Sequence, residues 1–304
     1  TFNFIYDVNF KGLQECKTKR EQRVIYSVQS LNIDDSNYSD PYLVNKALDY
    51  HDFSKKGGRV ISIEGIEGDR VLVRQENTSY IYNAYLELNT NVDTVLLSTG
   101  NIFRSKPVQY SSSTNGYFGT QHKDILHTPF GHISVDARRG QVHLLGSGGQ
   151  GLEEISNQGL RHWFSENLPF QIEKHFPGIN IDDNYNGIGI SLGYDKKFNQ
   201  MFITKLDYQP KSEDVKYNFE TNKFYLQSSN QEVRLSDKKY FKNKSWTVSY
   251  SFYRKEWVSW MSWTPLYYLD GINTFLTGNE KGSFLHNTTN KSYGVFFNKI
   301  HPFI

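Results

Sequence analysis

Short runs of apolar residues, separated by turn-forming residues, dominate the chain and predict β-strands. Examples are residues 60–63, 71–73, 94–97 and 248–252, with Asn, Asp, Gly or Lys in the intervening turns. Branched and aromatic side chains pack well on a pleated sheet, and short runs between turns are typical of an all-β domain. The pattern therefore predicts a mainly β protein.

One segment departs from the strand pattern and predicts helix. Between Leu152 and Phe176, apolar residues recur mostly at three- and four-residue spacing, which places them along one face of a helix. Pro169 interrupts this stripe, so we expect two helical pieces with a break or kink between them. The sequence thus predicts a helical insertion at about 152–176.

A recurring hairpin pattern indicates a larger repeat. In each copy, an apolar-Ser-apolar strand leads over a turn with two adjacent basic residues into a second strand. The copies are residues 133–145, 190–203 and 248–258, with a looser one at 61–73. Ser134, Ser191 and Ser249 are 57 and 58 residues apart. Hairpins at this interval are typical of a β-propeller with large blades, in which a small Ser lets neighbouring sheets approach; another sandwich or barrel is the alternative.

These patterns predict one β-propeller-like region over residues 1–304, with repeated antiparallel hairpins and the helical insertion inside it. Residues 1–93 are the less certain blades or strands of this region, and the sequence leaves their placement open. The chain begins at Thr1 and has no signal-like apolar stretch. We therefore interpret it as a fragment of a longer chain.

Composition narrows the possible classes of protein. The 304 residues include 34 Lys and Arg against 32 Asp and Glu, a net charge of +2, which argues against a nucleic-acid-coating protein. The aromatic residues (21 Tyr, 21 Phe and 5 Trp) argue against disorder. No apolar run reaches about 18 residues, so we expect no membrane span. A single cysteine, Cys16, cannot form an internal disulfide or a Cys-based zinc site.

The segment Gly146–Gly151 reads G-x-G-x-x-G after an expected strand and before the expected helix, as in a dinucleotide-binding fingerprint. However, that strand belongs to an antiparallel hairpin. The acidic residue at the distance expected for binding the ribose of the cofactor, Glu173, lies inside the helical stripe. We therefore interpret the glycines as a hinge between strand and helix, and we expect no cofactor.

Other candidate chemistry is also weak. His122, His127 and His132 recur every five residues, a spacing that places them on neither one helix face nor one strand face, so we expect no metal site.

A glycosidase would need two carboxylates a few ångströms apart, and the sequence does not pair any of its candidates: Asp34, Asp35, Asp49, Asp52, Asp182, Asp183 and Asp207. The Asp-box repeat of sialidase-type propellers, the G-x-S-x-G elbow and H-E-x-x-H are not found. The sequence therefore predicts no enzyme and no catalytic residue.

The densest aromatic run is Trp257–Trp263. Strict alternation would place Trp257, Ser259, Met261 and Trp263 on one strand face and Val258 and Trp260 on the other. Large residues on both faces favour the buried centre of a blade. A ligand platform and a subunit interface are the alternatives.

Several segments resemble virion structural proteins of crAss-like bacteriophages, and among them the large tail protein called the muzzle or nozzle in short-tailed phages. They are Asp136–Gly140, Gly151–Ser156, Arg161–Phe164 and Tyr250–Trp263 running into Pro265, with Phe275, Leu285–Asn287 and Tyr293-Gly294. The resemblance covers roughly residues 95–300.

The resemblance implies a propeller-bearing virion protein that assembles as a ring at the distal end of the tail, closes the DNA channel and rearranges for genome ejection. Its expected partners are other copies of itself, neighbouring tail proteins and, transiently, exiting phage DNA; it brings no catalytic residues. The basic pairs Arg138-Arg139 and Arg254-Lys255 are candidate contacts between subunits, or else solvated turns. The alternative is a carbohydrate-binding or carbohydrate-active β-propeller acting on a bacterial surface glycan, with Trp260 and Trp263 as the residues to test.

Overall fold

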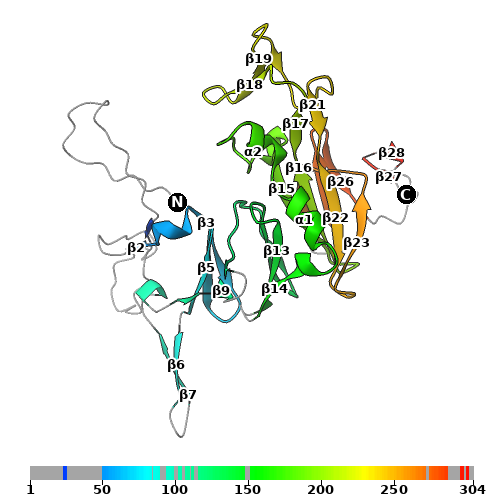
Figure 1. Cartoon of the computed structure of the whole chain (residues 1–304). Coiled ribbons are helices and arrows are strands. Elements are labelled where there is room, and N and C mark those ends of the chain that lie inside the picture. The colour runs from blue at the N-terminus through cyan, green and yellow to red at the C-terminus, as the bar shows by residue number, and fades with distance from the viewer. Residues whose placement is uncertain are drawn as a thin grey trace, which may run out of the picture. The chain divides into compact units, whose positions relative to one another are not determined.

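The computed structural model describes residues 23–25, 50–83, 85–89, 94–98, 102–104, 107–109, 111–112, 116–147, 151–271, 274–286, 295–297 and 299–300. The chain divides into two compact units, residues 1–119 and 120–304. Antiparallel sheets are the main regular structure in the described part of each unit (Figure 1), so the protein is mainly β, as the apolar pattern predicts.

The elements of the first unit are β1 (Arg23–Ile25), β2 (Tyr50–Asp52), η2 (Lys55–Gly57), β3 (Val60–Ile66), β4 (Arg70–Gln75), β5 (Ser79–Asn83), β6 (Tyr85–Asn89), β7 (Thr94–Ser98), η3 (Ile102–Arg104), β8 (Val108–Gln109), β9 (Ser111–Ser112) and β10 (Gly116–Tyr117). The largest sheet has the order β3-β4-β5-β8. The predicted strands at 60–63 and 71–73 form the antiparallel hairpin β3–β4, and the predicted strand at 94–97 is β7. A buried cluster is made by Phe53, Val73, Tyr82 and Phe103.

The elements of the second unit are β11 (Leu126–Thr128), β12 (Gly131–Asp136), β13 (Gln141–Gly146), β14 (Leu152–Glu154), η5 (Ile155–Asn157), α1 (Arg161–Asn167), α2 (Gln171–His175), η6 (Asn184–Asn186), β15 (Gly189–Asp195), β16 (Gln200–Leu206), β17 (Tyr208–Pro210), β18 (Val215–Asn218), β19 (Lys223–Leu226), β20 (Glu232–Val233), β21 (Phe241–Asn243), β22 (Trp246–Ser251), β23 (Glu256–Met261), β24 (Tyr267–Asp270), β25 (Phe275–Asn279), β26 (Gly282–Leu285), β27 (Val295–Phe296) and β28 (Lys299–Ile300).

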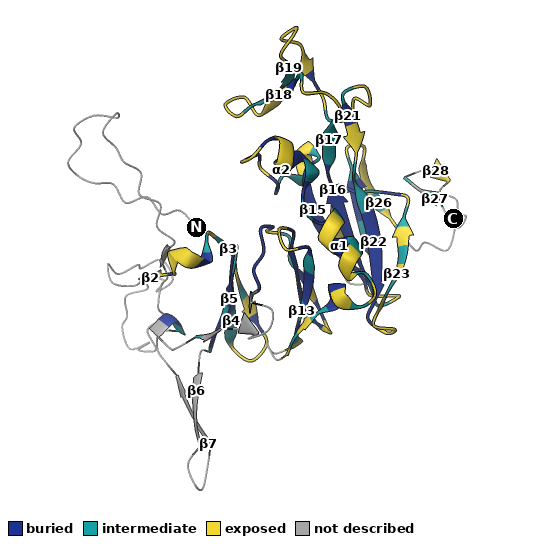
Figure 2. Cartoon of the chain, viewed as in Figure 1, coloured by how far each residue is buried: buried dark blue, intermediate teal, exposed yellow. Residues whose placement is uncertain are grey.

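A four-stranded sheet in the order β15-β16-β22-β23 is the centre of the second unit. Figure 2 shows β15, β16 and β22 buried, while α1 and α2 expose their outer sides. One sheet face carries the main core, which includes Leu192, Met201, Ile203, Val248 and Tyr250 from the strands and Ile155, Phe164, Leu168 and Ile172 from the helical segment. Burial of this apolar surface holds the helical segment on the sheet.

The opposite face of the central sheet carries small and hydroxyl-bearing residues beside Phe202, and the sheet β24-β25-β26 packs against it. The Ser191 hydroxyl donates to the backbone carbonyl of Leu266 at 2.8 Å. A methyl group on Gly193 would lie 2.4 Å from the ring of Tyr268, and the hydroxyl of that Tyr lies 2.6 Å from the hydroxyl of Thr204. The small residues let the sheets approach closely, as expected for Ser191.

The predicted hairpins form, but their interval does not mark successive sheets. The copies at 133–145, 190–203 and 248–258 are the antiparallel pairs β12–β13, β15–β16 and β22–β23. The second and third copies belong to the same four-stranded sheet, because β16 pairs with β22. Over the described ranges, the sheets do not close into a barrel or a propeller.

The segment expected to be helical from Leu152 begins instead with β14, which pairs with β13. Its helical part is η5, α1 and α2, and Pro169 lies between α1 and α2, where a break was predicted. Proline cannot donate a backbone hydrogen bond, so it separates the two helices.

A buried ion pair fixes the junction between these helices. Lys205 and Asp207 are 1% and 0% exposed, with Nζ and Oδ2 2.7 Å apart. Lys205 also donates to the carbonyls of Asn167 and Pro169, at 2.8 and 3.0 Å. The Asp207 carboxylate accepts from the backbone N–H groups of Gln171 and Ile172 at the start of α2 and from that of Tyr208. The buried charges are thus hydrogen-bonded to backbone groups at the helix ends, which have no partner within their own helix.

Some residues discussed above lie outside the described ranges, namely Cys16, Asp34, Asp35, Asp49, Asn287, Tyr293 and Gly294.

Candidate functional site

The aromatic strand β23 is an edge strand of its sheet rather than the buried centre that its sequence favours. A β-bulge shifts its register opposite Ser249 and Tyr250. Val248 pairs with Trp260 and Tyr250 pairs with Trp257, so both tryptophans lie on the same face. The predicted separation of Trp257 from Trp260 is therefore wrong, because a bulge inserts one residue and breaks the two-residue alternation.

On that face four side chains, Trp163, Trp246, Trp257 and Trp260, form a tryptophan cluster, in which Trp257 is linked to Trp163 through the ring of Phe164. The ring of Trp163 lies 4.8 Å from that of Trp246 and 5.7 Å from that of Trp260. The indole N–H of Trp257 donates to the carbonyl of Ile155 at 2.9 Å. Trp260 remains 53% exposed. The cluster therefore anchors α1 and also presents an apolar edge to solvent.

Trp263, by contrast, belongs to the core. It is 4% exposed and packs with Phe202 and Phe275 between the sheets. Of the two tryptophans considered as a glycan platform, only Trp260 is accessible enough to stack on a sugar.

The outer face of the sheet β24-β25-β26 carries exposed apolar side chains. Leu269, Leu276 and Leu285 lie opposite one another on the three strands, and the first and last are 48% and 50% exposed. Tyr267 lies over Gly278 and is 37% exposed. We call these four residues (Tyr267, Leu269, Leu276 and Leu285) the outer apolar row. Contiguous apolar surface of this kind is typical of a contact site.

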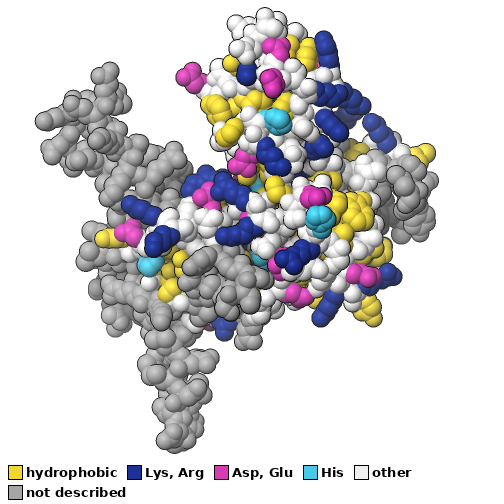
Figure 3. All heavy atoms as spheres, viewed as in Figure 1, with side chains coloured by type: hydrophobic (Ala, Val, Ile, Leu, Met, Phe, Trp, Pro, Cys, Tyr) yellow, Lys and Arg dark blue, Asp and Glu magenta, His cyan; other side chains and the backbone are white. Residues whose placement is uncertain are grey.

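The basic hairpin tips are paired with acidic groups. Arg139 Nη1 lies 3.0 Å from Asp136 Oδ2, and Arg138 Nη2 lies 3.7 Å from Glu173 Oε1. Arg254 Nη1 lies 3.6 Å from Glu256 Oε1. These tips are thus only partly available to a partner. A more open basic surface lies beside β17 and β21 (Figure 3), where the exposed lysines are Lys211, Lys238, Lys239 and Lys242.

The two ends of the glycine motif, Gly146 and Gly151, lie at the end of β13 and just before β14, and residues 148–150 lie outside the described ranges. Gly146 donates its backbone N–H to the carbonyl of Gly151 at 2.9 Å, and β14 rather than a helix follows. The expected hinge into a helix is therefore wrong.

Two of the three histidines are closer than their spacing predicts. A tight turn places His127 and His132 directly opposite each other on β11 and β12, with their Nδ1 atoms 2.6 Å apart. His122 lies elsewhere, fully buried, with Nδ1 3.7 Å from Asp182 Oδ1. Among the residues with a described position, no group of three or more His, Cys, Asp or Glu could hold a metal ion.

Three of the candidate aspartates, Asp182, Asp183 and Asp207, make contacts that support the fold. Asp183 caps η6 by accepting hydrogen bonds from the backbone and side-chain nitrogens of Asn186. Burial opposes ionisation of Asp182, but the neighbouring ring of His122, followed by the backbone N–H and the charge of Lys123, outweighs it and lowers the pKa of Asp182. Asp207 belongs to the ion pair at the helix junction. Each carboxylate holds a separate piece of the fold together.

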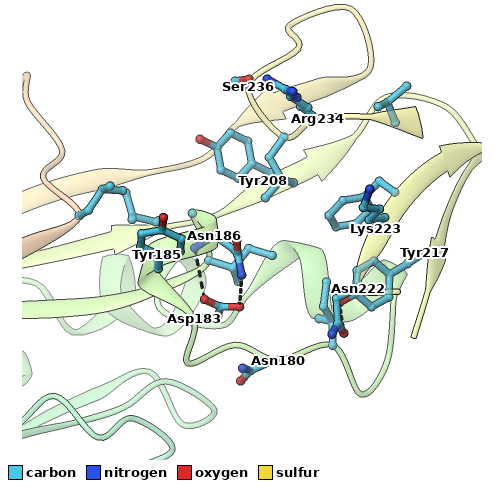
Figure 4. A pocket seen from close by; sticks show the side chains of 18 of the residues that line it. Asn180, Asp183, Tyr185, Asn186, Tyr208, Tyr217, Asn222, Lys223, Arg234 and Ser236 are labelled. Atoms are coloured by element: carbon cyan, nitrogen blue, oxygen red, sulfur yellow. Dashed lines mark hydrogen bonds between the residues drawn. The ribbon is translucent and has the colours of Figure 1, made fainter. Parts of the chain in front are cut away.

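A pocket of about 620 Å³ was not predicted from the sequence. It lies between the segment around η6, the start of β17, the hairpin β18–β19 and the residues after β20 (Figure 4). We call it the tyrosine pocket, because Tyr185, Tyr208 and Tyr217 line it. The Asn-rich stretch 180–186, which includes Tyr185, was the signal in the sequence that could have indicated it.

The tyrosine pocket combines aromatic rings with hydrogen-bonding groups. Tyr217 donates its hydroxyl to Asn222 Oδ1 at 3.1 Å, and its ring lies 4.8 Å from that of Phe224. Burial and, secondarily, the charge of Asp183 raise the pKa of Tyr217. Burial and the charge of Glu280 likewise raise the pKa of Tyr208. Both phenols therefore stay protonated and can donate hydrogen bonds at neutral pH.

No protein-family model matches the sequence, and no curated protein matches it significantly. In the part of the chain with described positions, no helix has the length and apolar character needed to cross a bilayer. The observed features define a mainly β protein with an outer apolar row, an exposed tryptophan edge, a basic surface and a polar aromatic pocket.

Proposed function

We propose that the chain is a structural component of a bacteriophage tail, of the muzzle or nozzle type, and not an enzyme. In this proposal it forms part of a ring that closes the DNA channel and allows genome ejection. We further propose that its antiparallel sheets belong to a β-propeller-like arrangement in the longer protein. The motifs that resemble crAss-like phage virion proteins support this assignment.

The observation that carries the proposal is the outer apolar row. Leu269 and Leu285, on either side of Leu276 in one sheet, expose about half of their surface. Contact with another subunit would remove this surface from water. Trp260 adds a second apolar edge on β23, and aromatic residues are enriched at such contacts. Other copies of the chain and neighbouring tail proteins are the proposed occupants.

The basic surface beside β17 and β21 supports a transient contact with exiting DNA. Lys238, Lys239 and Lys242 are all exposed and lie close together in the sequence. Only two uncharged residues, Tyr240 and Phe241, separate them. Lysines attract phosphates without reading base sequence, and the attraction weakens with salt. Weak, salt-sensitive binding of duplex DNA would support this contact, and its loss should follow charge reversal at these lysines.

The ring contact is tested by sedimentation of the purified chain. We expect the wild-type chain to form concentration-dependent oligomers, and a Leu269→Glu, Leu285→Glu double variant to sediment as a monomer at the same concentration. Tyr253→Glu is the matched control, because Tyr253 is 88% exposed and lies outside the outer apolar row. A wild-type monomer at every concentration, or equal oligomers in the double variant, would contradict the contact.

A second candidate function is a carbohydrate-binding protein that acts on a bacterial surface glycan. The observation that favours it is the tyrosine pocket, with its rings and amide side chains. Trp263 is too deeply buried to take part.

A further inference from the structure

We propose that the tyrosine pocket binds a short, neutral oligosaccharide. This inference does not rest on the tail assignment, because a ring subunit and a separate binding protein could both present the pocket. It supplies the second candidate function with a site and a ligand class.

The size and lining of the pocket fit a ligand of this kind. Its volume of about 620 Å³ lies within the range of about 300–1,000 Å³ found for small-molecule sites. Tyrosine offers a flat apolar ring with a polar tip, which suits the C–H face of a sugar ring flanked by hydroxyls. Figure 4 shows Tyr185, Tyr208 and Tyr217 around the pocket rather than on one side of it.

Two of the tyrosines are held in place before any ligand arrives. Tyr217 is fixed by its hydrogen bond to Asn222 and by ring contacts with Phe219 and Phe224, at 4.9 and 4.8 Å. Tyr208 is half-buried, and its ring lies 6.5 Å from that of Phe241. Because these rings are already ordered, a ligand loses little free energy in organising them.

The third tyrosine forms the open rim. Tyr185 is 89% exposed on η6, and Asp183 and Asn186 brace that turn through two hydrogen bonds, at 3.2 and 2.7 Å. A turn that is rigid but carries an exposed ring can cover a sugar from solvent at small entropic cost.

The charges of the lining favour a neutral ligand. Lys223 is paired with Glu232 at 2.7 Å, and Asp183 is already hydrogen-bonded to Asn186. Asp183 keeps its charge in that hydrogen bond, so the lining holds three carboxylates (Asp183, Glu232 and Glu280) against two cations (Lys223 and Arg234). The lining therefore carries no excess of cations to hold a phosphate or an acidic sugar. Asn180, Asn222, Thr221, Thr264 and Ser236 supply uncharged donors and acceptors for sugar hydroxyls.

The test uses the full chain on an array of neutral and acidic bacterial oligosaccharides, with single-stranded DNA oligonucleotides on the same surface. We expect retention of at least one neutral oligosaccharide, followed by a measurable dissociation constant in titration calorimetry. Tyr185→Ala should weaken that affinity about tenfold by removing one stacking ring. Tyr253→Ala, an equally exposed tyrosine in the β22–β23 turn, should leave it unchanged.

Tyr217→Phe keeps the packed ring but removes the hydroxyl that orders Asn222, so it should also weaken affinity without unfolding the chain. Retention of no oligosaccharide, retention of acidic ones or DNA alone, or equal affinity in the Tyr185→Ala variant would overturn the inference. None of these results bears on where the chain lies in a virion, so failure here is distinct from failure of the tail proposal.

Discussion

Replacing Asp207 by Asn should destabilise the second unit strongly. The carboxylate accepts four hydrogen bonds, from Lys205 and from the backbone of Gln171, Ile172 and Tyr208. An Asn amide has one acceptor oxygen, so its NH₂ group would face two of these donors. The substitution also leaves the buried Lys205 ammonium without a counter-charge.

The magnitude follows from burial. Breaking a fully buried ion pair by removing one partner costs about 3–5 kcal/mol. If the free energy of unfolding falls by about 2 kcal/mol per M urea, the urea concentration at the unfolding midpoint should fall by about 1.5–2.5 M. The matched control is Glu232→Gln, because the Lys223–Glu232 pair is more than half exposed. Its loss should cost less than about 1 kcal/mol.

The assay is urea unfolding of the full chain followed by tryptophan fluorescence. All five tryptophans lie between positions 163 and 263, so their emission reports on the second unit alone. A midpoint shift for Asp207→Asn no larger than that for Glu232→Gln would refute the reasoning that the buried pair holds the helix junction.

Three further predictions concern the same unit. The fold holds the pKa of Asp182 below its ordinary value of 3.8. The ionised carboxylate therefore stabilises the fold above that pH, and this stabilisation is lost as the pH falls through the pKa of the folded state. The difference in melting temperature between wild type and Asp182→Asn should shrink below about pH 4. A constant difference down to pH 2 would contradict this. Gly193→Ala should cost about 1–3 kcal/mol in urea unfolding, because the new methyl meets the Tyr268 ring; an unchanged midpoint would show that the sheets are not in close contact there. Trp263→Ala should lower the free energy of unfolding by about 3–5 kcal/mol, but Trp260→Ala by only about 1 kcal/mol. The reason is that Trp263 is 4% exposed and Trp260 is 53% exposed. Similar losses in the two variants would contradict this difference in burial.

Local patterns predict local structure well in this chain. The hairpins at 60–73 and 133–145 and the break at Pro169 follow from apolar alternation, turn residues and the missing N–H of proline, all of which act within a few residues. The start of the helical segment was less predictable. Residues 152–154 fit the helical spacing but pair instead with β13, because partners in the sheet decide between the two structures.

Features that depend on distant partners could not be predicted. The bulge that brings Trp257 and Trp260 to one face depends on the register with β22. His127 and His132 meet only because the turn between them is tight enough to pair their positions across two strands. The tyrosine pocket draws its lining from several segments between residues 179 and 280, and no spacing in the sequence reports such a convergence.

The central claim is that the chain belongs to the distal end of a phage tail. Immunogold electron microscopy, with antibody raised against this chain, tests it on purified virions of the phage whose genome encodes the chain. We predict gold particles at the free end of the tail. Gold spread over the capsid, or no label on intact virions together with release of sugars from a surface glycan by the same chain, would contradict the claim.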